Sequence, residues 1–189
     1  LAAGDVLLIH GVGSGVGTAA LQLAAVRGAR AIGTSRSAWK LERAVELGLH
    51  HAVDPGREDF PHAVLRLTAG HGADVVLDLV GGDYLRGNLE ALAARGRIVI
   101  VGLVAGATAT LDMRTLMRKR GHICGTVMRT RPLREKVAVA AAFRDDALHH
   151  FDTGRLRPVI DSVLPMTGAA AAHARLEANE NFGKVVLRW

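Results

Sequence analysis

Short apolar runs alternate along the chain with longer stretches in which apolar residues recur every three or four positions. The short runs are rich in Val, Ile and Leu and predict strands buried on both faces, at residues 6–9, 31–34, 51–53, 75–79, 97–101 and 123–128. The longer stretches predict helices at residues 18–27, 37–47, 60–68, 84–94 and 112–120. Strands that alternate with helices pair in parallel through right-handed crossovers. The pattern therefore predicts an α/β protein, a doubly wound parallel sheet (Rossmann fold) of six strands.

The pattern changes in the last third of the chain. It predicts one long helix at residues 133–150, an extended segment at 156–164 that Pro158 interrupts, an alanine-rich helix at 168–178 and a final strand at 184–187. These elements do not continue the alternation of buried strands and helices. We therefore expect residues 1–130 to form the Rossmann domain and residues 131–189 to form a C-terminal α+β appendage with a surface of its own to cover.

Composition agrees with a globular domain whose core is aliphatic. Of the 189 residues, 49% are hydrophobic and only 4% are aromatic, which favours a sheet covered by helices over an aromatic-rich β-sandwich. The single cysteine, Cys124, excludes an intrachain disulfide and a cysteine-cluster zinc site. No apolar run is long enough to span a membrane, so we expect a cytoplasmic protein without a membrane partner. The net charge of +6 favours anionic partners, either nucleic acid or phosphorylated small molecules.

A glycine-rich turn, residues 10–18, follows the first predicted strand and leads into a helix. A phosphate must approach the backbone closely there, and a side chain on the turn would block it. The helix N-terminus offers free N–H groups and a partial positive charge to a pyrophosphate. The glycines stand at 11, 13, 15 and 17, so the strict G-x-G-x-x-G pattern is not met. The place of the turn after the first strand nevertheless predicts a dinucleotide site.

The end of the second predicted strand indicates which dinucleotide is bound. NAD sites place an acidic residue about 20 residues after the glycine turn, to bind the ribose 2′-OH. Here Ser35, Arg36 and Ser37 are followed by Lys40, and the first acid is Glu42, inside the predicted helix. Hydroxyls and cations suit a 2′-phosphate, so we favour NADP(H). The alternative is that Arg36 and Lys40 are solvated charges and that Ser37 is only a helix cap.

Two further glycine-containing turns follow the fourth and fifth predicted strands. They are 78–82, which includes Val80 and Gly81, and 101–103, which includes Gly102 and Leu103. Ligands of open α/β sheets bind at this edge, and glycines there let a flat ring approach the backbone. We interpret these turns as the nicotinamide end of the site. Ordinary strand-to-helix turns would have the same composition.

The sequence resembles a known family in five segments spread over nearly the whole chain. They read VLLIHGVGSGVGTAALQLA (6–24), KLERAVELG (40–48), DLVGG (78–82), GTVMRTRP (125–132) and EANENFGKVVL (177–187). They resemble the medium-chain dehydrogenase/reductases, and among these the zinc-independent NADPH:quinone oxidoreductases. The resemblance implies a Rossmann fold, an NADP(H) cofactor, no metal and a small-molecule quinone or enone substrate.

The resemblance also implies roles for individual residues. It implies that the pyrophosphate is held by Ser14, Gly15, Val16, Gly17 and Thr18. It places Ser37 and Lys40 at the 2′-phosphate, and Val80, Gly102 and Leu103 around the nicotinamide. Phe182 and Lys184 would lie close to the cofactor. Two positions depart from the family pattern: Pro55 stands where a tyrosine is frequent, and Arg36 where glycine is common.

Family members carry a catalytic domain of over a hundred residues before the region that this chain matches. The resemblance therefore implies that the chain is the cofactor-binding portion and that residues 131–189 fold back onto that domain. The substrate cleft would lie between the two domains, so the chain would hold half of it and be inactive alone. No proton donor can be named; Tyr84 is conceivable, but packing explains its position equally well. The sheet edge at 123–128 would pair in a homodimer.

Other chemistries find less support. Four histidines form two pairs of sequence neighbours, 50–51 and 149–150. Because the side chains of adjacent residues point apart on a helix or a strand, we expect no metal site. A basic stretch at 114–136 has no interleaved aromatic residues, which favours a solvated face over a nucleic-acid surface. The leading hypothesis is an NADPH-dependent oxidoreductase that transfers hydride to a quinone or a conjugated carbonyl. The alternatives are a non-catalytic nucleotide-binding module and a basic nucleic-acid-binding domain with the same fold.

Overall fold

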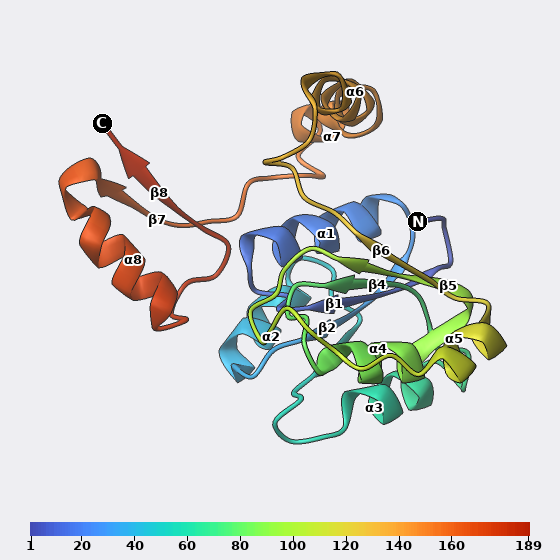
Figure 1. The fold of residues 1–189 in the computed structure, drawn as a ribbon. Coiled ribbons are helices and arrows are strands. Elements are labelled where there is room, and N and C mark those ends of the chain that lie inside the picture. Colours follow the sequence, from blue (N-terminus) through green and yellow to red (C-terminus); the bar gives the residue numbers. More distant parts are fainter.

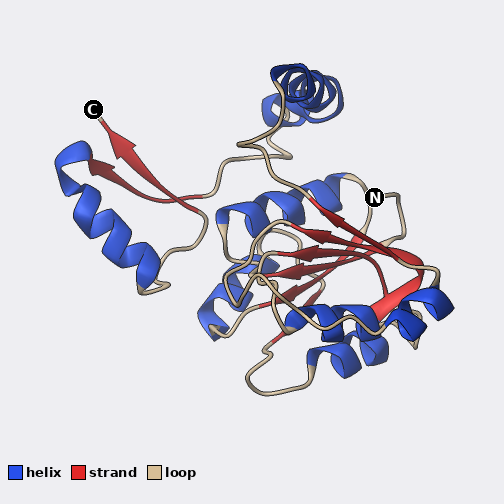
Figure 2. Ribbon diagram, viewed as in Figure 1, coloured by secondary structure: helices blue, strands red, loops and turns tan.

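Six parallel strands form one sheet in the computed structural model, which describes residues 1–189 (Figures 1 and 2). The strands are β1 (Val6–His10), β2 (Arg30–Thr34), β3 (His51–Val53), β4 (Ala73–Asp78), β5 (Leu92–Ile100) and β6 (His122–Gly125). Their order is β3-β2-β1-β4-β5-β6. The direction of winding therefore reverses between β1 and β4, the place where open α/β sheets bind ligands. This confirms the predicted doubly wound fold.

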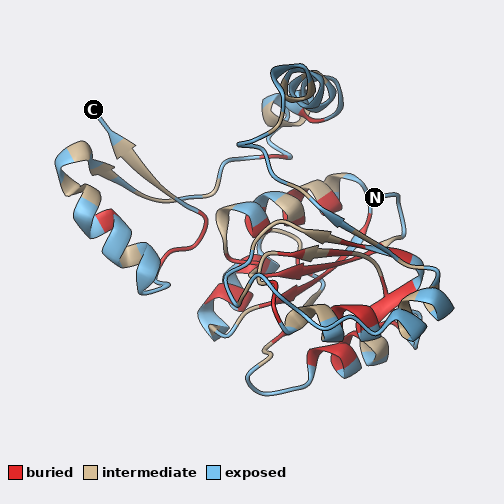
Figure 3. Ribbon diagram, viewed as in Figure 1, coloured by how far each residue is buried: buried red, intermediate tan, exposed pale blue.

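Five helices cover the two faces of the sheet (Figure 1). They are α1 (Gly15–Val26), α2 (Ala38–Val45), α3 (Phe60–Leu67), α4 (Tyr84–Ala91) and α5 (Met113–Lys119). Successive β1 residues alternate between the faces: Leu7 and Ile9 pack with α1 and α2, whereas Val6 and Leu8 pack with α3 and α4. All five β1 residues are buried, as the apolar run predicted, and the core lies on both sides of the sheet (Figure 3).

Several predicted boundaries were wrong. The helix expected at 84–94 ends at Ala91, because Leu92 pairs with Ala73 and begins β5. Helix α1 begins at Gly15, three residues before the predicted start, because the Ser14 side chain caps it. Strand β6 ends at Gly125 rather than at residue 128. Residue Ser37 occupies the N-cap position of α2 but makes no side-chain capping hydrogen bond.

The last third forms the predicted α+β appendage beside the Rossmann sheet (Figure 1). In place of one helix at 133–150, α6 (Leu133–Phe143) and α7 (His149–Asp152) are joined by a π-helical turn, Arg144–Leu148. Strands β7 (Ile160–Pro165) and β8 (Lys184–Arg188) pair in parallel across α8 (Ala169–Glu177). Strand β7 begins after Pro158, later than the predicted extended segment. None of the helices combines the length and the apolar character that a membrane-spanning segment requires.

Candidate functional site

A cleft of about 590 Å³ lies at the carboxyl edge of the sheet, at the point where the winding reverses. Its walls come from the glycine loop, the end of β2, the turns after β4 and β5, and the appendage. The predicted site residues that line it are Ser14, Gly15, Val16, Ser35, Arg36, Lys40, Val80, Gly102 and Lys184. The others, which do not line it, are Gly17, Thr18, Ser37, Gly81, Leu103 and Phe182. Residues 35 and 184 thus meet in one cleft although they lie far apart in the sequence.

The glycine loop presents the N-terminus of α1 to this cleft. The Ser14 hydroxyl accepts a hydrogen bond from the Gly17 N–H at 3.0 Å and so caps the helix. A Cβ at Gly17 would lie 2.5 Å from the Gly11 carbonyl oxygen, so this glycine is needed for the turn itself. A Cβ at Gly15 would meet only the flexible end of Lys184. Gly11, which also lines the cleft, has open space at its Cβ position, so a ligand can approach the backbone of the loop at Gly11 and, once the Lys184 side chain moves, at Gly15.

A lysine in the first turn of α2, shortly after the end of β2, supplies a cation to the cleft. The Lys40 side chain is buried, and its Nζ donates a hydrogen bond to Asn179 Oδ1 at 2.6 Å. Its aliphatic part crosses the loop so closely that a Cβ at Gly13 would lie 2.9 Å from Cδ. Burial lowers the pKa of Lys40, and the carboxylate of Asp161 opposes that shift. The ammonium group is thus held at the wall of the cleft by a residue of the appendage.

Of the other predicted site residues after β2, Ser35 and Arg36 line the cleft and Ser37 does not. Ser35 lines the cleft, and its hydroxyl accepts a hydrogen bond from the Ser37 N–H at 3.1 Å. Arg36 is exposed and faces the same space as Tyr84 of α4. Burial raises the pKa of the Tyr84 phenol, and the positive charge of Arg36 acts in the opposite direction. Tyr84 stacks on the Phe60 ring, with centroids 5.3 Å apart, so packing fixes its place.

The appendage is joined to the glycine loop by the backbone. The Gly183 N–H donates a hydrogen bond to the Gly13 carbonyl at 2.8 Å, and Ser14 and Gly183 form a parallel bridge. The neighbouring residue Phe182 is buried, and the Arg43 guanidinium lies 4.6 Å from the centroid of its ring. The appendage also lines the cleft with residues that sequence reasoning missed: Leu176, Glu177, Asn179 and Asn181. The available signal was the EANENFGK segment, in which the resemblance assigns roles only to Phe182 and Lys184.

The turns after β4 and β5 close the far end of the cleft. Gly81 has a φ of +69°, and a Cβ there would lie 2.9 Å from the Gly106 carbonyl oxygen. A Cβ at Gly102 would lie 2.5 Å from the Leu79 carbonyl oxygen. These glycines let the two turns pack against each other, and Val80 and Gly102 then face the cleft. Leu103 is exposed, lies against Gly81 and does not line the cleft.

A buried chain of polar groups lies under this edge of the sheet, and sequence reasoning did not find it. His10 Nδ1 lies 2.9 Å from Thr34 Oγ1, and Nε2 lies 2.6 Å from Asn88 Oδ1. Asn88 Nδ2 donates to Asp78 Oδ2 at 2.9 Å. All four residues are buried. The signal in the sequence was a histidine at the end of an otherwise apolar strand, a position where a polar group needs a partner.

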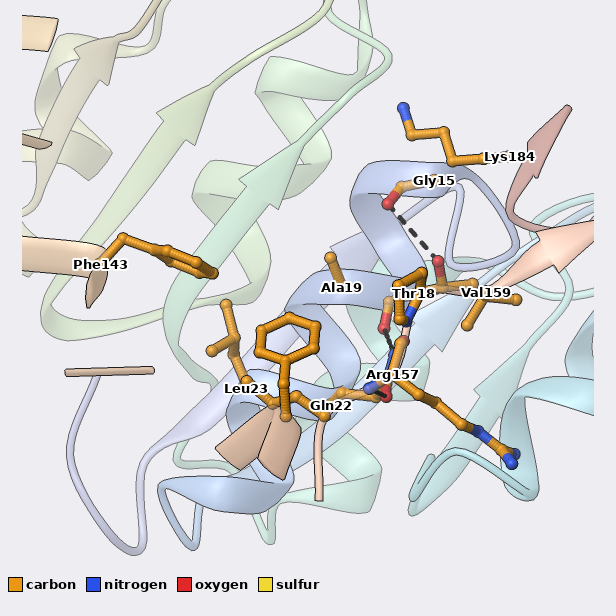
Figure 4. A pocket seen from close by; sticks show the side chains of 12 residues that line it. Gly15, Thr18, Ala19, Gln22, Leu23, Phe143, Arg157, Val159 and Lys184 are labelled. Carbon is orange, nitrogen blue, oxygen red and sulfur yellow. Dashed lines mark hydrogen bonds between the residues drawn. The ribbon is translucent and has the colours of Figure 1, made fainter. Parts of the chain in front are cut away.

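A second, smaller cavity of about 260 Å³ lies on the outer side of α1 (Figure 4). It is lined mainly by apolar side chains, among them Leu23 and Phe143. The Gln22 amide both accepts from the Arg157 N–H and donates to the Arg157 carbonyl, each at 3.0 Å. Gln22 therefore ties the linker that leads into β7 to the Rossmann sheet's first helix.

No group of three or more His, Cys, Asp or Glu side chains lies close enough together to hold a metal ion. Several side chains of the basic stretch are bound within the chain. Lys119 Nζ donates to the Glu90 carbonyl at 2.6 Å, and Arg131 Nε donates to the Val127 carbonyl at 2.9 Å. Such contacts cap and brace nearby backbone.

Comparisons with known proteins agree with the fold. A family model described as zinc-binding dehydrogenase matches residues 15–144. The chain is 31% identical over 188 residues to a 2-haloacrylate reductase of a Burkholderia species, covering 97% of this chain and 55% of the reductase. The Escherichia coli quinone oxidoreductase, solved in complex with NADPH, matches with a TM-score of 0.85 and 26% identity over 99% of this chain and 58% of that one.

An NAD-dependent alcohol dehydrogenase of known structure is similar at 37% identity and a TM-score of 0.83, covering all of this chain and 52% of that one. One of these two solved structures is thus of an NAD-dependent enzyme, and the other holds NADPH. The chain spans about half the length of the relatives that it matches.

Proposed function

Because the chain belongs to the zinc-binding dehydrogenase family, we propose that it is the NADP(H)-binding part of an oxidoreductase that reduces quinones or other conjugated carbonyl compounds. The observation that carries this proposal is the cleft at the carboxyl edge of the sheet. There the open N-terminus of α1 lies beside Lys40, Arg36 and Lys184. Partial and full positive charges together suit a dinucleotide with an additional phosphate.

The residues present fit the coenzyme. The N-terminus of α1, with Ser14, Gly15 and Val16, would hold the pyrophosphate, since the atoms nearest to a Cβ at Gly15 belong to the flexible side chain of Lys184. Gly17 and Thr18 would support that turn from below. Thr18 is buried, and its hydroxyl donates to the Gly15 carbonyl at 3.4 Å.

The preference for NADP(H) over NAD(H) rests on the end of β2. Ser35, Arg36 and Lys40 line the cleft there, and Ser37 begins α2 beside them. The first carboxylate after the strand is Glu42, within the helix, where it does not line the cleft. At the end of β2 a 2′-phosphate would therefore meet hydroxyls and cations, while the acidic residue that does line the cleft, Glu177, lies at the end of α8.

Val80 and Gly102 would flank the nicotinamide, with Gly81 and Leu103 shaping the turns around them. Bound NADPH supplies hydride from C4 of its nicotinamide ring. The residues of this chain orient the coenzyme and cover one face of it. Similarity to a quinone oxidoreductase and to a 2-haloacrylate reductase supports an electrophilic conjugated acceptor as the substrate.

We assign residues 1–130 to the coenzyme domain and residues 131–189 to a segment that would pack on an N-terminal catalytic domain. Exposed apolar side chains support this assignment. Leu133, Val137 and Phe143 of α6 are exposed, and α6 has no fully buried residue. A surface of this kind on a monomer indicates a docking face. We expect the chain alone to bind coenzyme without turning over substrate.

The chain does not offer ligands for the zinc in the family's name, since it has no cluster of potential metal-binding side chains. We also propose a homodimer that forms through β6, the strand at one edge of the sheet. Sedimentation of the chain at increasing concentration tests it, and a monomer at all concentrations would contradict it.

Coenzyme binding is tested by titrating the chain with NADPH and with NADH while nicotinamide fluorescence is recorded. We expect NADPH to bind at least about tenfold more tightly, the equivalent of about 1.4 kcal/mol. Equal affinities would contradict the NADP(H) preference. Binding of neither coenzyme would contradict the proposed function. Addition of a simple benzoquinone to the NADPH complex is expected to leave the coenzyme unoxidised.

A further inference from the structure

We propose that Asn88 is a positioning residue for the nicotinamide end of the cleft, acting through a directional hydrogen-bond chain from Thr34 to the turn after β4. The proposal rests on the proposed function, because it assumes which half of the coenzyme lies at Val80 and Gly102. The three central residues of this hydrogen-bond chain are His10, Asn88 and Asp78, and none of them lines the cleft. These residues act on the cleft through the backbone of the turn that Asp78 holds.

The chain joins three elements that meet where the winding of the sheet reverses. His10 ends β1, Asp78 ends β4, and Asn88 projects from α4 between them. Each of these three side chains has no measurable exposure, so water does not compete for its hydrogen bonds. The His10 ring also packs in T-shaped geometry against Phe60 and Tyr84, with ring centroids 4.9 Å away in both cases. The position of every member is therefore fixed by packing as well as by hydrogen bonds.

The hydrogen bonds run in one direction. The Asn88 amide nitrogen donates to the Asp78 carboxylate, so the Asn88 carbonyl oxygen faces His10. An oxygen needs a donor, which places the His10 proton on Nε2. Burial lowers the pKa of His10, so the ring is neutral and Nδ1 accepts from the Thr34 hydroxyl. The negative charge of Asp78 thus sets the orientation of the whole chain.

From Asp78 the chain reaches the wall of the cleft. The second carboxylate oxygen, Oδ1, accepts from the Val80 N–H at 2.8 Å and from the Gly81 N–H at 2.9 Å. The Val80 carbonyl in turn accepts from the Ala105 N–H at 2.8 Å. The carboxylate therefore fixes the turn after β4, and that turn fixes the loop after β5.

The other end of the cleft does not depend on this chain in the same way. The Ser35 N–H is bonded to the Val53 carbonyl at 3.2 Å, and the Thr34 carbonyl accepts from the Val12 N–H at 3.1 Å. These backbone bonds hold the end of β2 without help from Asn88. Loss of Asn88 should therefore loosen the Val80 turn and leave the adenosine end in place. A purely structural role would instead affect both ends equally.

The test compares two ligands, NADPH and its fragment 2′,5′-ADP, by calorimetric titration of the protein. Asn88→Leu keeps the side-chain shape and removes both hydrogen bonds. We expect it to weaken NADPH binding by about tenfold, and 2′,5′-ADP binding by less than about twofold, because buried partners are left unpaired at one end only. Leu85→Ala is the matched control: Leu85 lies on the same helix and packs on the same core without joining the chain, so it should weaken both ligands equally or not at all.

Equal loss of both ligands in Asn88→Leu, or no loss of either, would overturn the inference while leaving the proposed function intact. Wild-type chain that binds neither ligand would contradict the proposed function itself. The two failures are therefore distinguishable.

A second measurement applies if Asn88→Leu does not fold. Asp78→Asn keeps the acceptor for the Val80 and Gly81 N–H groups and replaces the other oxygen by a donor. The Asn88 amide would then turn over and donate to His10, whose proton would move from Nε2 to Nδ1. Nitrogen-15 NMR of the His10 ring reports this tautomer directly. We expect the Nε2–H form in the wild type and the Nδ1–H form in Asp78→Asn. The same tautomer in both proteins would overturn the directional chain.

Discussion

The ammonium group of Lys40, on α2, donates a hydrogen bond to the side-chain oxygen of Asn179, which follows α8, over 2.6 Å. This contact joins the Rossmann sheet's second helix to the appendage. It places a buried cation at the wall of the cleft without a carboxylate partner within hydrogen-bonding distance. An anion that enters the cleft can therefore use this charge.

Removing the Lys40 ammonium should weaken NADPH binding selectively. Lys40→Met keeps the apolar stem that crosses Gly13 and deletes the charge together with the hydrogen bond to Asn179. We expect NADPH affinity to fall by about tenfold to a hundredfold, because a hydrogen bond to a charged group contributes about 1.5–3 kcal/mol. NADH affinity should change by less than about twofold. Fluorescence titration measures both, and Arg66→Met, which removes an exposed arginine paired with Glu58, is the control. A parallel loss of both coenzymes in Lys40→Met would place Lys40 away from the 2′-phosphate.

Two glycines of the same loop should respond differently to alanine. At Gly17 the new Cβ would strike the carbonyl oxygens of Gly11 and Val12, which cannot move without breaking the turn. We expect Gly17→Ala to lower the free energy of unfolding by about 1–3 kcal/mol, the usual cost of overpacking. At Gly15 the Cβ would displace only the end of Lys184. Gly15→Ala should change stability by less than about 1 kcal/mol.

The same Gly15→Ala variant should weaken NADPH binding by about tenfold or more, since the added methyl group displaces the pyrophosphate from the helix N-terminus. Urea denaturation and coenzyme titration of both variants separate the two effects. Unchanged NADPH affinity in Gly15→Ala would show that the ligand does not approach the backbone there.

The linker before β7 should open when Gln22 loses its amide. Gln22→Met preserves length and leaves both backbone groups of Arg157 without partners. A hydrogen bond contributes about 0.5–1.5 kcal/mol, and these two bonds are part-buried, so local opening should become about fivefold or more frequent. Limited trypsin digestion after Arg155 measures it, because Pro158 protects the bond that follows Arg157. Leu23→Met changes a side chain of the same cavity without a hydrogen bond and should be cleaved like the wild type. Equal cleavage of all three proteins would contradict the anchoring role.

The appendage should lose stability in acid. Burial alone would raise the pKa of Asp161, but hydrogen bonds from Arg175 and from the Phe182 N–H hold it below its ordinary value. A carboxyl group whose pKa is lower in the folded state than in the unfolded state stabilises the folded state. This contribution is fully present above the pKa of the unfolded state, about 3.9 for Asp. That contribution disappears as the pH falls from there through the folded pKa. Near neutral pH it is intact.

Hydrogen exchange of the β8 amides, corrected for the intrinsic rate, should therefore accelerate below about pH 4, the ordinary Asp range. In Asp161→Asn the exchange should already be faster at neutral pH, and this acid-dependent increment should be absent. An identical acid response in the variant would show that another group controls the appendage.

Local pattern decided the strands and their order of appearance, because an apolar run such as β1 buries both faces wherever it lies. It also located the glycine loop and the cations after β2. It failed where pairing overrode propensity. Leu92 and Ala93 favour helix locally, yet they are buried in β5, and Arg95 with a φ of +65° marks the irregular junction.

The tertiary structure alone decided which distant residues meet. His10, Asp78 and Asn88 come together only because β1 and β4 are neighbours and α4 packs across them. Asn179 reaches Lys40 only because the appendage is bonded to the glycine loop. Burial of a strand face depends on the side chains nearby in sequence, whereas a buried hydrogen bond depends on the relative placement of elements separated by 78 or 139 positions. No periodicity in the sequence records that placement.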